Sequence, residues 1–420
     1  MRARVTVVSI ILLTAVACTG PSDPQTPADP PAGLALTDVL TLGTQDGTVI
    51  VGSTSGTVLS SRGSQLAAPD GSRLYATIRS GASTTLESRD SSTGDVLSST
   101  TIRGTLDARA ASLSGSAVAL MRPLPVGVDT TYALPRAHTT IVVADPAGER
   151  PSRRYRLEGN FEPEAFSIDD ARLFLIQYLP AEAPTAYRVT FLELESGRVR
   201  QVFGRFKTPP ARMPGIRLAQ VFDPSSDQLY TLYTNRAAGQ GYGGWADASY
   251  GDGEVSFVHV LNLRKGWAYC AGLPRALWGQ PAKAQAMAPS PDGRSLYIVD
   301  TMGGRIAEMN TRSLKITRSR QVDLGPLGEG RTSARISADG RTLFVGDGGS
   351  SLVRIDVRTL EVIGRWQLPG AVSGLAMSED GARLYAALGG PVAVVDTGTG
   401  DASATLPFGH VESVLHVATP

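Results

Sequence analysis

The feature that most constrains this chain is a repeat that covers most of its length. The clearest copies begin at residues 290, 337 and 378 and read SPDGRSLYIVD, SADGRTLFVGD and SEDGARLYAAL. In each copy an Asp-Gly turn leads into a strand of mainly apolar residues, a Gly-rich turn leads into a second strand, and a third strand follows. Short strands at regular spacing, with turn residues between them, predict an all-β fold.

Fainter copies extend the repeat towards the N-terminus. The strand-like pieces RLYATI, AVALM, RLFLIQY and QLYTLY each follow a cluster of turn residues. Counting one hairpin per copy, at positions 70, 115, 170, 227, 293, 340 and 381, gives seven copies. Self-similarity with a period of about 40 to 50 residues is typical of propeller blades. The sequence therefore predicts a seven-bladed β-propeller of four-stranded antiparallel blades over residues 36–420.

The two ends of this domain carry further strand-like pieces. GTVIVG and GTVL lie within residues 47–59, and ESVLHV lies at 412–417. Chain ends of this kind usually meet in one blade and close the ring, which removes open sheet edges. If these pieces form a blade of their own, the number of blades becomes eight.

The hairpin S-[PAE]-D-G-x-x-[LY]-[YF]-[VIA], followed by V-x-x-[ID]-D-x-x-T, resembles the YVTN repeat of YncE-like propellers. The resemblance covers most of residues 60–410, and it is strong in the last three copies and weak in the first four. The Gly-His and Trp-Asp signatures of WD40 repeats are absent from the sequence. Propellers of this kind include binding modules and several enzymes, so the resemblance implies the fold and leaves the activity open.

The N-terminus has the pattern of an export signal. Arg2 and Arg4 precede an apolar run, Val5 to Ala17, which at about 13 residues is too short to span a bilayer. The run ends Ala15-Val16-Ala17-Cys18, which resembles a bacterial lipobox. The resemblance implies cleavage before Cys18 and transfer of diacylglycerol to its sulfur. The alternative is an ordinary secretory signal followed by an incidental cysteine.

These signals predict the organisation and location of the chain. Residues 1–17 form a lipoprotein signal peptide, residues 18–35 form the lipidated cysteine with a Pro-rich tether, and residues 36–420 form the propeller. We expect an exported protein held on the outer side of a bacterial cell membrane by its lipid anchor. Only four of the 40 basic residues are lysines, a bias that fits a GC-rich, actinobacterial-type genome.

Charge and cysteine content limit the partners and the framework. Loss of residues 1–17 leaves 38 basic and 39 acidic residues, so the mature net charge of −1 gives no reason to expect nucleic-acid binding. We expect a monomer. With Cys18 lipidated, Cys270 has no disulfide partner in the chain, and we expect it to be a small buried apolar residue rather than a reactive thiol.

No motif in the sequence identifies a catalytic, cofactor or metal site. The Gly-x-Gly-x-x-Gly match at residues 239–244 is not followed by a helical pattern, so dinucleotide binding is not indicated. The four histidines lack ligand spacing, and Asp252 with Glu254 falls short of the six oxygen ligands of calcium. The repeated turn aspartates are expected to stabilise Asp-Gly hairpins rather than to carry chemistry; they are Asp70, Asp292, Asp339 and Asp380.

Five insertions are expected on one face of the ring. Residues 123–138, 179–186 and 235–255 would join the second and third strands of successive blades, and the long crossings 204–217 and 272–284 would lie on the same side. Long loops on a rigid scaffold frequently form binding sites. Alternatively, these loops pack on one another and cap the channel. The candidate ligand-binding residues are Tyr132, Arg212, Tyr242, Trp245, Tyr250 and Trp278, with Arg205, Lys207, Arg217 and Arg275 beside them.

Two functions fit these observations. One is a non-enzymatic recognition module that binds a protein, a glycan or a small molecule through the elaborated face. The other is a propeller enzyme, such as a lyase or lactonase, with its site at the mouth of the central channel. The innermost strands would supply the candidates for that second site, namely Glu164, Gln220, Gln285, Arg335 and Glu412.

Overall fold

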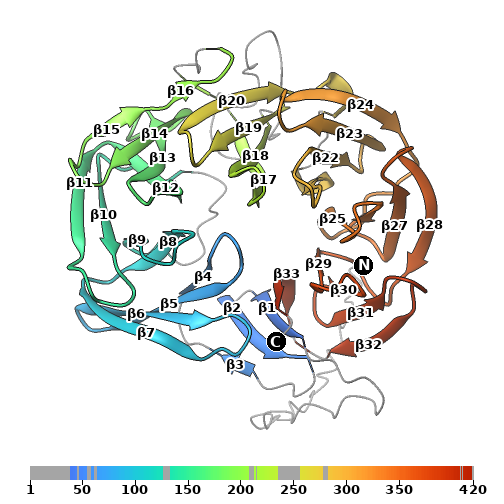
Figure 1. Cartoon of the computed structure of the whole chain (residues 1–420), viewed down its shortest axis with the longest axis horizontal. Coiled ribbons are helices and arrows are strands. Elements are labelled where there is room, and N and C mark those ends of the chain that lie inside the picture. The colour runs from blue at the N-terminus through green and yellow to red at the C-terminus, as the bar shows by residue number, and fades with distance from the viewer. Residues whose placement is uncertain are drawn as a thin grey trace, which may run out of the picture.

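The computed structural model describes residues 38–44, 47–53, 58–60, 64–125, 133–207, 212, 213, 215–234, 256–277, 282–406, 408 and 410–418. These residues form eight antiparallel sheets arranged in a ring, so the fold is an eight-bladed β-propeller (Figure 1). The described helices are two single 3₁₀ turns, η1 (Arg275–Leu277) and η2 (Ala282–Ala284). Within the described part of the chain, no helix has the length and apolar character needed to cross a membrane.

Blades 2 to 8 each use four consecutive strands, with the first strand innermost. Blades 2 to 4 contain β4 (Ser64–Ala67), β5 (Arg73–Ser80), β6 (Ser83–Asp90) and β7 (Val96–Arg103), then β8 (Asp107–Ala111), β9 (Val118–Met121), β10 (His138–Ala144) and β11 (Arg153–Glu158), then β12 (Asn160–Phe166), β13 (Arg172–Leu179), β14 (Ala186–Glu193) and β15 (Val199–Gln201).

Blade 5 has a fifth strand, because β16 pairs in parallel with the outer edge of β20 before the chain returns to the ring axis. Blades 5 to 8 contain β16 (Phe203–Gly204), β17 (Ile216–Asp223), β18 (Gln228–Thr234), β19 (Ser256–Asn262) and β20 (Trp267–Gly272), then β21 (Gln285–Pro289), β22 (Ser295–Asp300), β23 (Arg305–Asn310) and β24 (Lys315–Gln321), then β25 (Ser333–Ile336), β26 (Thr342–Gly346), β27 (Ser351–Asp356) and β28 (Glu361–Gln367), then β29 (Gly374–Met377), β30 (Arg383–Ala387), β31 (Val392–Asp396) and β32 (Ala402–Leu406).

Blade 1 is built from both ends of the described chain. The C-terminal strand β33 (Val411–Ala418) is innermost, and β1 (Val39–Thr44), β2 (Gly47–Gly52) and β3 (Val58–Ser60) follow outwards. The predicted count of seven blades is therefore wrong, and the alternative of eight is correct. Each of the seven counted copies has a turn between its first two strands, but no turn joins β33 to β1, so a count of hairpins misses this blade.

The Asp-Gly turns have the structural role expected from the sequence. Gly71, Gly293, Gly340 and Gly381 have φ values of 75°, 64°, 72° and 71°, a region that glycine enters without steric cost. The preceding aspartate accepts a hydrogen bond from the backbone two residues later, as in Asp292 with the Arg294 amide at 3.0 Å. These turns define the turn face of the ring. The connections between second and third strands define the opposite loop face.

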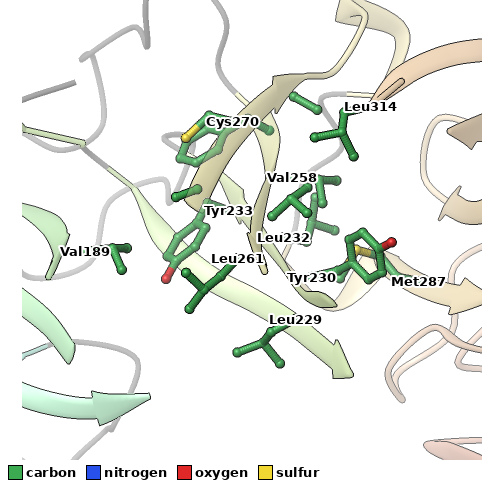
Figure 2. Close-up of a cluster of buried hydrophobic side chains, with 14 of the residues drawn as sticks. Val189, Leu229, Tyr230, Leu232, Tyr233, Val258, Leu261, Cys270, Met287 and Leu314 are labelled. Carbon is green, nitrogen blue, oxygen red and sulfur yellow. The ribbon is translucent and has the colours of Figure 1, made fainter. Parts of the chain in front are cut away.

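The largest described hydrophobic cluster joins blades 4, 5 and 6 (Figure 2). Tyr187 of β14 stacks on Tyr233 of β18 with ring centroids 4.7 Å apart, and Tyr233 lies 5.4 Å from Phe257. Cys270 of β20 is buried in this cluster, with its sulfur 3.5 Å from that of Met213, which agrees with the predicted apolar role. The stack ties neighbouring blades together where the chain crosses between them.

A buried carboxylate stabilises the seam at which the ring closes. Asp38, just before β1, has 0% exposure. It accepts hydrogen bonds from Arg383 Nε at 2.9 Å and from the Tyr385 hydroxyl at 2.5 Å, both on β30 of blade 8. Because a buried charge is costly unless it is paired and hydrogen-bonded, this contact fixes how blade 1 sits against blade 8.

We expect ring closure to depend on the apolar side of β33. Val414 is 3% exposed and packs between blades 1 and 8, whereas its neighbour Leu415 is 45% exposed. Val414→Asp should lower the free energy of unfolding by several kcal/mol, because it buries an unpaired carboxylate at the seam. Leu415→Asp is the matched control and should change stability by less than about 0.5 kcal/mol. Equal melting temperatures for the two variants would contradict closure through β33.

Candidate functional site

The strand order supports three of the five predicted insertions as connections between second and third strands. Residues 122–137 join β9 to β10 in blade 3, residues 180–185 join β13 to β14 in blade 4, and residues 235–255 join β18 to β19 in blade 5. These three blades follow one another around the ring (Figure 1). Of the candidate ligand-binding residues, Arg212 is described and exposed. Tyr132, Tyr242, Trp245, Tyr250 and Trp278, like Cys18, lie outside the described residues, and their roles stay predictions.

The inner strands of blades 3 to 5, together with the end of the connection between β9 and β10, hold a group of polar side chains. In β12 the burial alternates, so that Glu162 and Glu164 are partly open while their neighbours are buried. Inner strands run from the loop face to the turn face, which places residues early in β12 and β17 near the loop-side mouth of the ring. We call this group the axial cluster; it consists of Arg109, Arg136, Glu162, Glu164, Arg217 and Gln220.

Glu162 of blade 4 lies between two arginines that both come from blade 3. Arg136 Nη1 donates to Glu162 Oε2 at 3.0 Å and to the carbonyl oxygen of Phe161 at 3.1 Å. Arg109 Nε lies 3.7 Å from Glu162 Oε1, which is too long for a hydrogen bond. That Nε is buried and has no hydrogen-bond partner within the described part of the chain. Arg109 Nη2 donates to the Arg122 carbonyl oxygen at 3.3 Å, so among the described residues this guanidinium has an acceptor at Nη2 while its buried Nε has none.

Glu164 is the most enclosed member, with 5% of its side chain exposed. Gln220 Nε2 donates to its Oε1, and Arg217 Nη1 lies 3.5 Å from its Oε2. Burial raises the pKa of Glu164, while the charge of Arg217 and the Gln220 hydrogen bond oppose that rise. The carboxyl group is therefore closer to holding a proton at neutral pH than an ordinary glutamate.

Aromatic hydroxyls adjoin the two carboxylates. Burial raises the pKa of Tyr178, at the end of β13, well above its usual value, and both Glu162 and Glu164 add to that rise. Tyr233 is shifted in the same direction for the same leading reason. These phenols remain protonated and can act as hydrogen-bond donors. Together with the arginines they make the mouth suitable for an anionic group.

The structure unites two of the five predicted inner-strand candidates. Glu164 and Gln220 are hydrogen-bonded to each other, whereas Gln285 is buried and donates to the Leu277 carbonyl oxygen at 2.7 Å, a structural contact. Arg335 and Glu412 are not members of the cluster: Arg335 lines a depression nearer the turn face, and Glu412 is exposed on β33.

Sequence reasoning missed Arg109, Arg136 and Glu162. The signal available was the two-residue spacing of Glu162 and Glu164 on one strand, which places both on the same side. The arginines come from a different blade, and nothing in their local sequence marks them.

Other predicted residues lie elsewhere. Arg205, assigned from sequence to the loop-face crossing, instead stacks on Trp267 at 4.6 Å, because β16 first follows the outer edge of β20. His138 pairs with Glu158 at 2.9 Å, and burial lowers the pKa of His259 to about 4. Within the residues that the structure describes, no group of three or more His, Cys, Asp or Glu side chains is placed to hold a metal.

Comparison with known proteins supports the fold. No protein-family model matches the sequence, and no curated protein matches it. Similar solved structures include the dihydro-heme d1 dehydrogenase NirN in complex with DHE, which is 16% identical, with a TM-score of 0.54 and coverage of 92% of this chain and 77% of that chain. Apo AztD from Citrobacter koseri is 11% identical, with a TM-score of 0.53 and coverage of 91% and 97%. Both are β-propellers, and at these identities the likeness shows the fold alone.

The raised pKa of Glu164 predicts a pH-dependent effect of Glu164→Gln. A carboxyl group whose pKa is higher in the folded than in the unfolded protein costs stability as pH rises through and above its usual value. The melting temperature of Glu164→Gln, relative to that of the wild type, should therefore rise from about pH 4.5 towards pH 7. Glu195→Gln, on an exposed turn, should show no such trend. A difference that is constant across this range would contradict the assigned shift.

Proposed function

We propose that this protein is a membrane-anchored recognition module that binds an anionic ligand at the loop-side mouth of its ring. The observation that carries the proposal is the axial cluster, in which three arginines and two glutamates meet at the loop-side mouth of the ring. Binding sites on rigid β scaffolds are frequently built in this way, with fixed polar groups below and variable loops above.

The charges of the cluster favour an anion. Arg109, Arg136 and Arg217 outnumber Glu162 and Glu164 by one, and a proton on Glu164 would increase that surplus. Arg331, from the crossing between blades 6 and 7, adds a further cation near β17, where its Nη2 donates to the Leu218 carbonyl oxygen at 2.9 Å. A carboxylate, sulfate or phosphate oxygen could accept hydrogen bonds from the guanidinium of Arg217, whose side chain is 52% exposed.

The predicted aromatic residues of the loops supplement this site. Tyr132, Tyr242 and Trp245 belong to connections that begin and end on the loop face. Aromatic and arginine side chains together suit a glycan, a peptide or a ring-bearing acid, because they combine large apolar contact with directed hydrogen bonds. The proposal is therefore a small anionic or acidic saccharide ligand, held by arginines and covered by the loops.

A second candidate, an enzyme, rests on Glu164 itself. A nearly buried carboxyl group with a raised pKa, beside Tyr178 and Arg217, has the properties of a general acid or base. The neighbour NirN is described as a dehydrogenase. A binder would retain ligand with Glu164→Gln and release it unchanged, whereas an enzyme would bind its substrate and lose turnover with that variant.

Citrate is a suitable probe for the anion site, because it carries several carboxylates. We expect wild-type protein to bind citrate, and Arg217→Gln to weaken that binding about tenfold, since a charge-assisted hydrogen bond contributes about 1.5–3 kcal/mol. Arg103→Gln is the matched control, because Arg103 is an exposed arginine at the loop-face end of β7 and is not among the candidate residues. Isothermal titration calorimetry at low salt measures the three affinities.

Two results would contradict an anion site in the axial cluster. One is a wild-type protein that does not bind citrate. The other is equal affinity for wild type, Arg217→Gln and Arg103→Gln, all folded as judged by their melting temperatures. Loss of binding with both variants would indicate general electrostatic attraction by the loop face rather than a defined site.

We further propose that the chain is a bacterial lipoprotein of the YVTN/YncE-like kind, exported and anchored through Cys18. The support is the basic start, the short apolar run, and small residues before a cysteine, followed by a Pro-rich tether. Asp38, where the described chain begins, lies on the turn face at the start of β1. In an anchored molecule the loop face, with its axial cluster, would then point away from the membrane.

Cys18→Ser tests the anchor directly. Without the sulfur no diacylglycerol can be attached, so the variant should fail to incorporate labelled fatty acid and should accumulate as an uncleaved precursor or in the released fraction. Cys270→Ser is the control and should be labelled like the wild type. A Cys18→Ser protein that still carries label and fractionates with membranes like the wild type would refute lipidation at this residue.

A further inference from the structure

A second polar depression lies on the opposite, turn face, between blades 5 and 6. It has a volume of about 760 Å³. Both blades contribute the turn between their first and second strands and the turn between their third and fourth strands. The end of β16 adds Arg205 at the outer side. We call this depression the inter-blade pocket.

Cations dominate the lining of the inter-blade pocket. Two aspartates, Asp227 and Asp292, face five basic residues, which are Arg205, Arg264, Lys265, Arg294 and Arg312. Arg264 forms an ion pair with Asp227, with Arg264 Nε 2.5 Å from Asp227 Oδ2. Arg294 is held more loosely, with its Nε 3.8 Å from Asp292 Oδ2. The surplus is three positive charges in one depression.

The remaining three cations have no acidic partner among the described residues. Arg205 lies over the Trp267 ring at 4.6 Å, which orients its guanidinium without neutralising it. Lys265 and Arg312 are exposed, and the side chain of neither forms an ion pair or a hydrogen bond within the described chain. Their charges are therefore available to a ligand.

The backbone that carries these cations is held rigidly. Asn262 Oδ1 accepts from the Lys265 amide at 2.7 Å, and Asn310 Oδ1 accepts from the Arg312 amide at 3.2 Å. The turns of the two blades also touch: a Cβ built on Gly293 would lie 1.6 Å from Ser225 Oγ. The spacing of the cations is thus set by the packing of blade 5 against blade 6 rather than by mobile side chains alone.

We propose that the inter-blade pocket is a binding site for phosphate groups. The surplus of three positive charges in the pocket is larger than the single negative charge of a carboxylate. It is closer to the charge of a dianionic phosphate or of a ligand with more than one phosphate. Arginines suit this chemistry because their planar donors pair with two phosphate oxygens at once, and a lysine adds a compact charge. The site is separate from the axial cluster, which lies at the other face of the ring.

The phosphate can belong to a lipid headgroup or to a soluble ligand. Asp38 lies on the same turn face as the inter-blade pocket and follows Cys18 by twenty residues. A protein anchored through Cys18 would therefore be able to bring this pocket to the phosphates of the membrane surface. The experiment below separates the two sources.

The test uses the full chain, purified in a non-ionic detergent. The soluble probe is inorganic tripolyphosphate, and the lipid probe is dihexanoyl phosphatidylglycerol, with dihexanoyl phosphatidylcholine as the neutral lipid. The variant is Lys265→Glu with Arg312→Glu. The control is Arg341→Glu with Arg358→Glu, because both residues lie on turn-face turns of blade 7 outside the inter-blade pocket, and Arg358 occupies the position that Arg312 occupies in blade 6. All four side chains are exposed, so both double variants should fold.

We expect wild type and the blade 7 control to bind tripolyphosphate with similar affinity, and the Lys265 and Arg312 variant to bind at least tenfold more weakly. Binding should also weaken as salt is added. The same pattern with phosphatidylglycerol, but not with phosphatidylcholine, assigns the pocket to a lipid headgroup; the pattern with tripolyphosphate alone assigns it to a soluble phosphate. Equal binding by both double variants, or no binding of either probe by the wild type, would overturn the proposal.

Discussion

The structure depends on the insertion of β33 as the innermost strand of blade 1. Without it, β1 would have an open edge at the ring axis, and the facing sides of blades 1 and 8 would lose their shared apolar core. Asp38 holds blade 1 in one position against blade 8, because its buried carboxylate accepts hydrogen bonds from Arg383 and Tyr385 of that blade. Apolar burial supplies the driving force, and the ion pair fixes the relative position of the two blades.

The two faces of the closed ring also differ in how long their connecting segments are. On the turn face, each Asp-Gly turn approaches the preceding blade closely, as Gly293 does with Ser225, so there is little room for longer connections. The connections between second and third strands begin and end at the opposite face, and in blades 3 to 5 they are 16, 6 and 21 residues long, covering residues 122–137, 180–185 and 235–255. Loops on a rigid scaffold tolerate such insertions.

The sequence was sufficient to predict the features that depend on neighbouring residues. Strand alternation, the Asp-Gly turns and the three long connections were all predicted, and Glu164 and Gln220 were placed correctly on inner strands. The eighth blade was missed as the main prediction because its strands are separated by almost the whole chain. Arg109, Arg136 and the inter-blade pocket were missed for a related reason; of the pocket's five cations, Arg205 alone was named from the sequence, and it was assigned to the opposite face. Their meeting follows from the stacking of blades, and residues about 50 positions apart carry no local sign of it.

The energetics of the axial cluster favour a role in binding over a role in stability. Groups of buried charges commonly contribute little net stability, because desolvation offsets the attraction between them. Here Glu164 is nearly buried with a raised pKa, and Arg109 Nε is buried with no acceptor among the described residues. Apolar side chains at these positions would avoid both costs, as they do at the inner strand of blade 8, where Gly374, Leu375 and Ala376 are buried. The polar groups at the mouth of blades 3 to 5 would gain hydrogen-bond partners from the ligand proposed above.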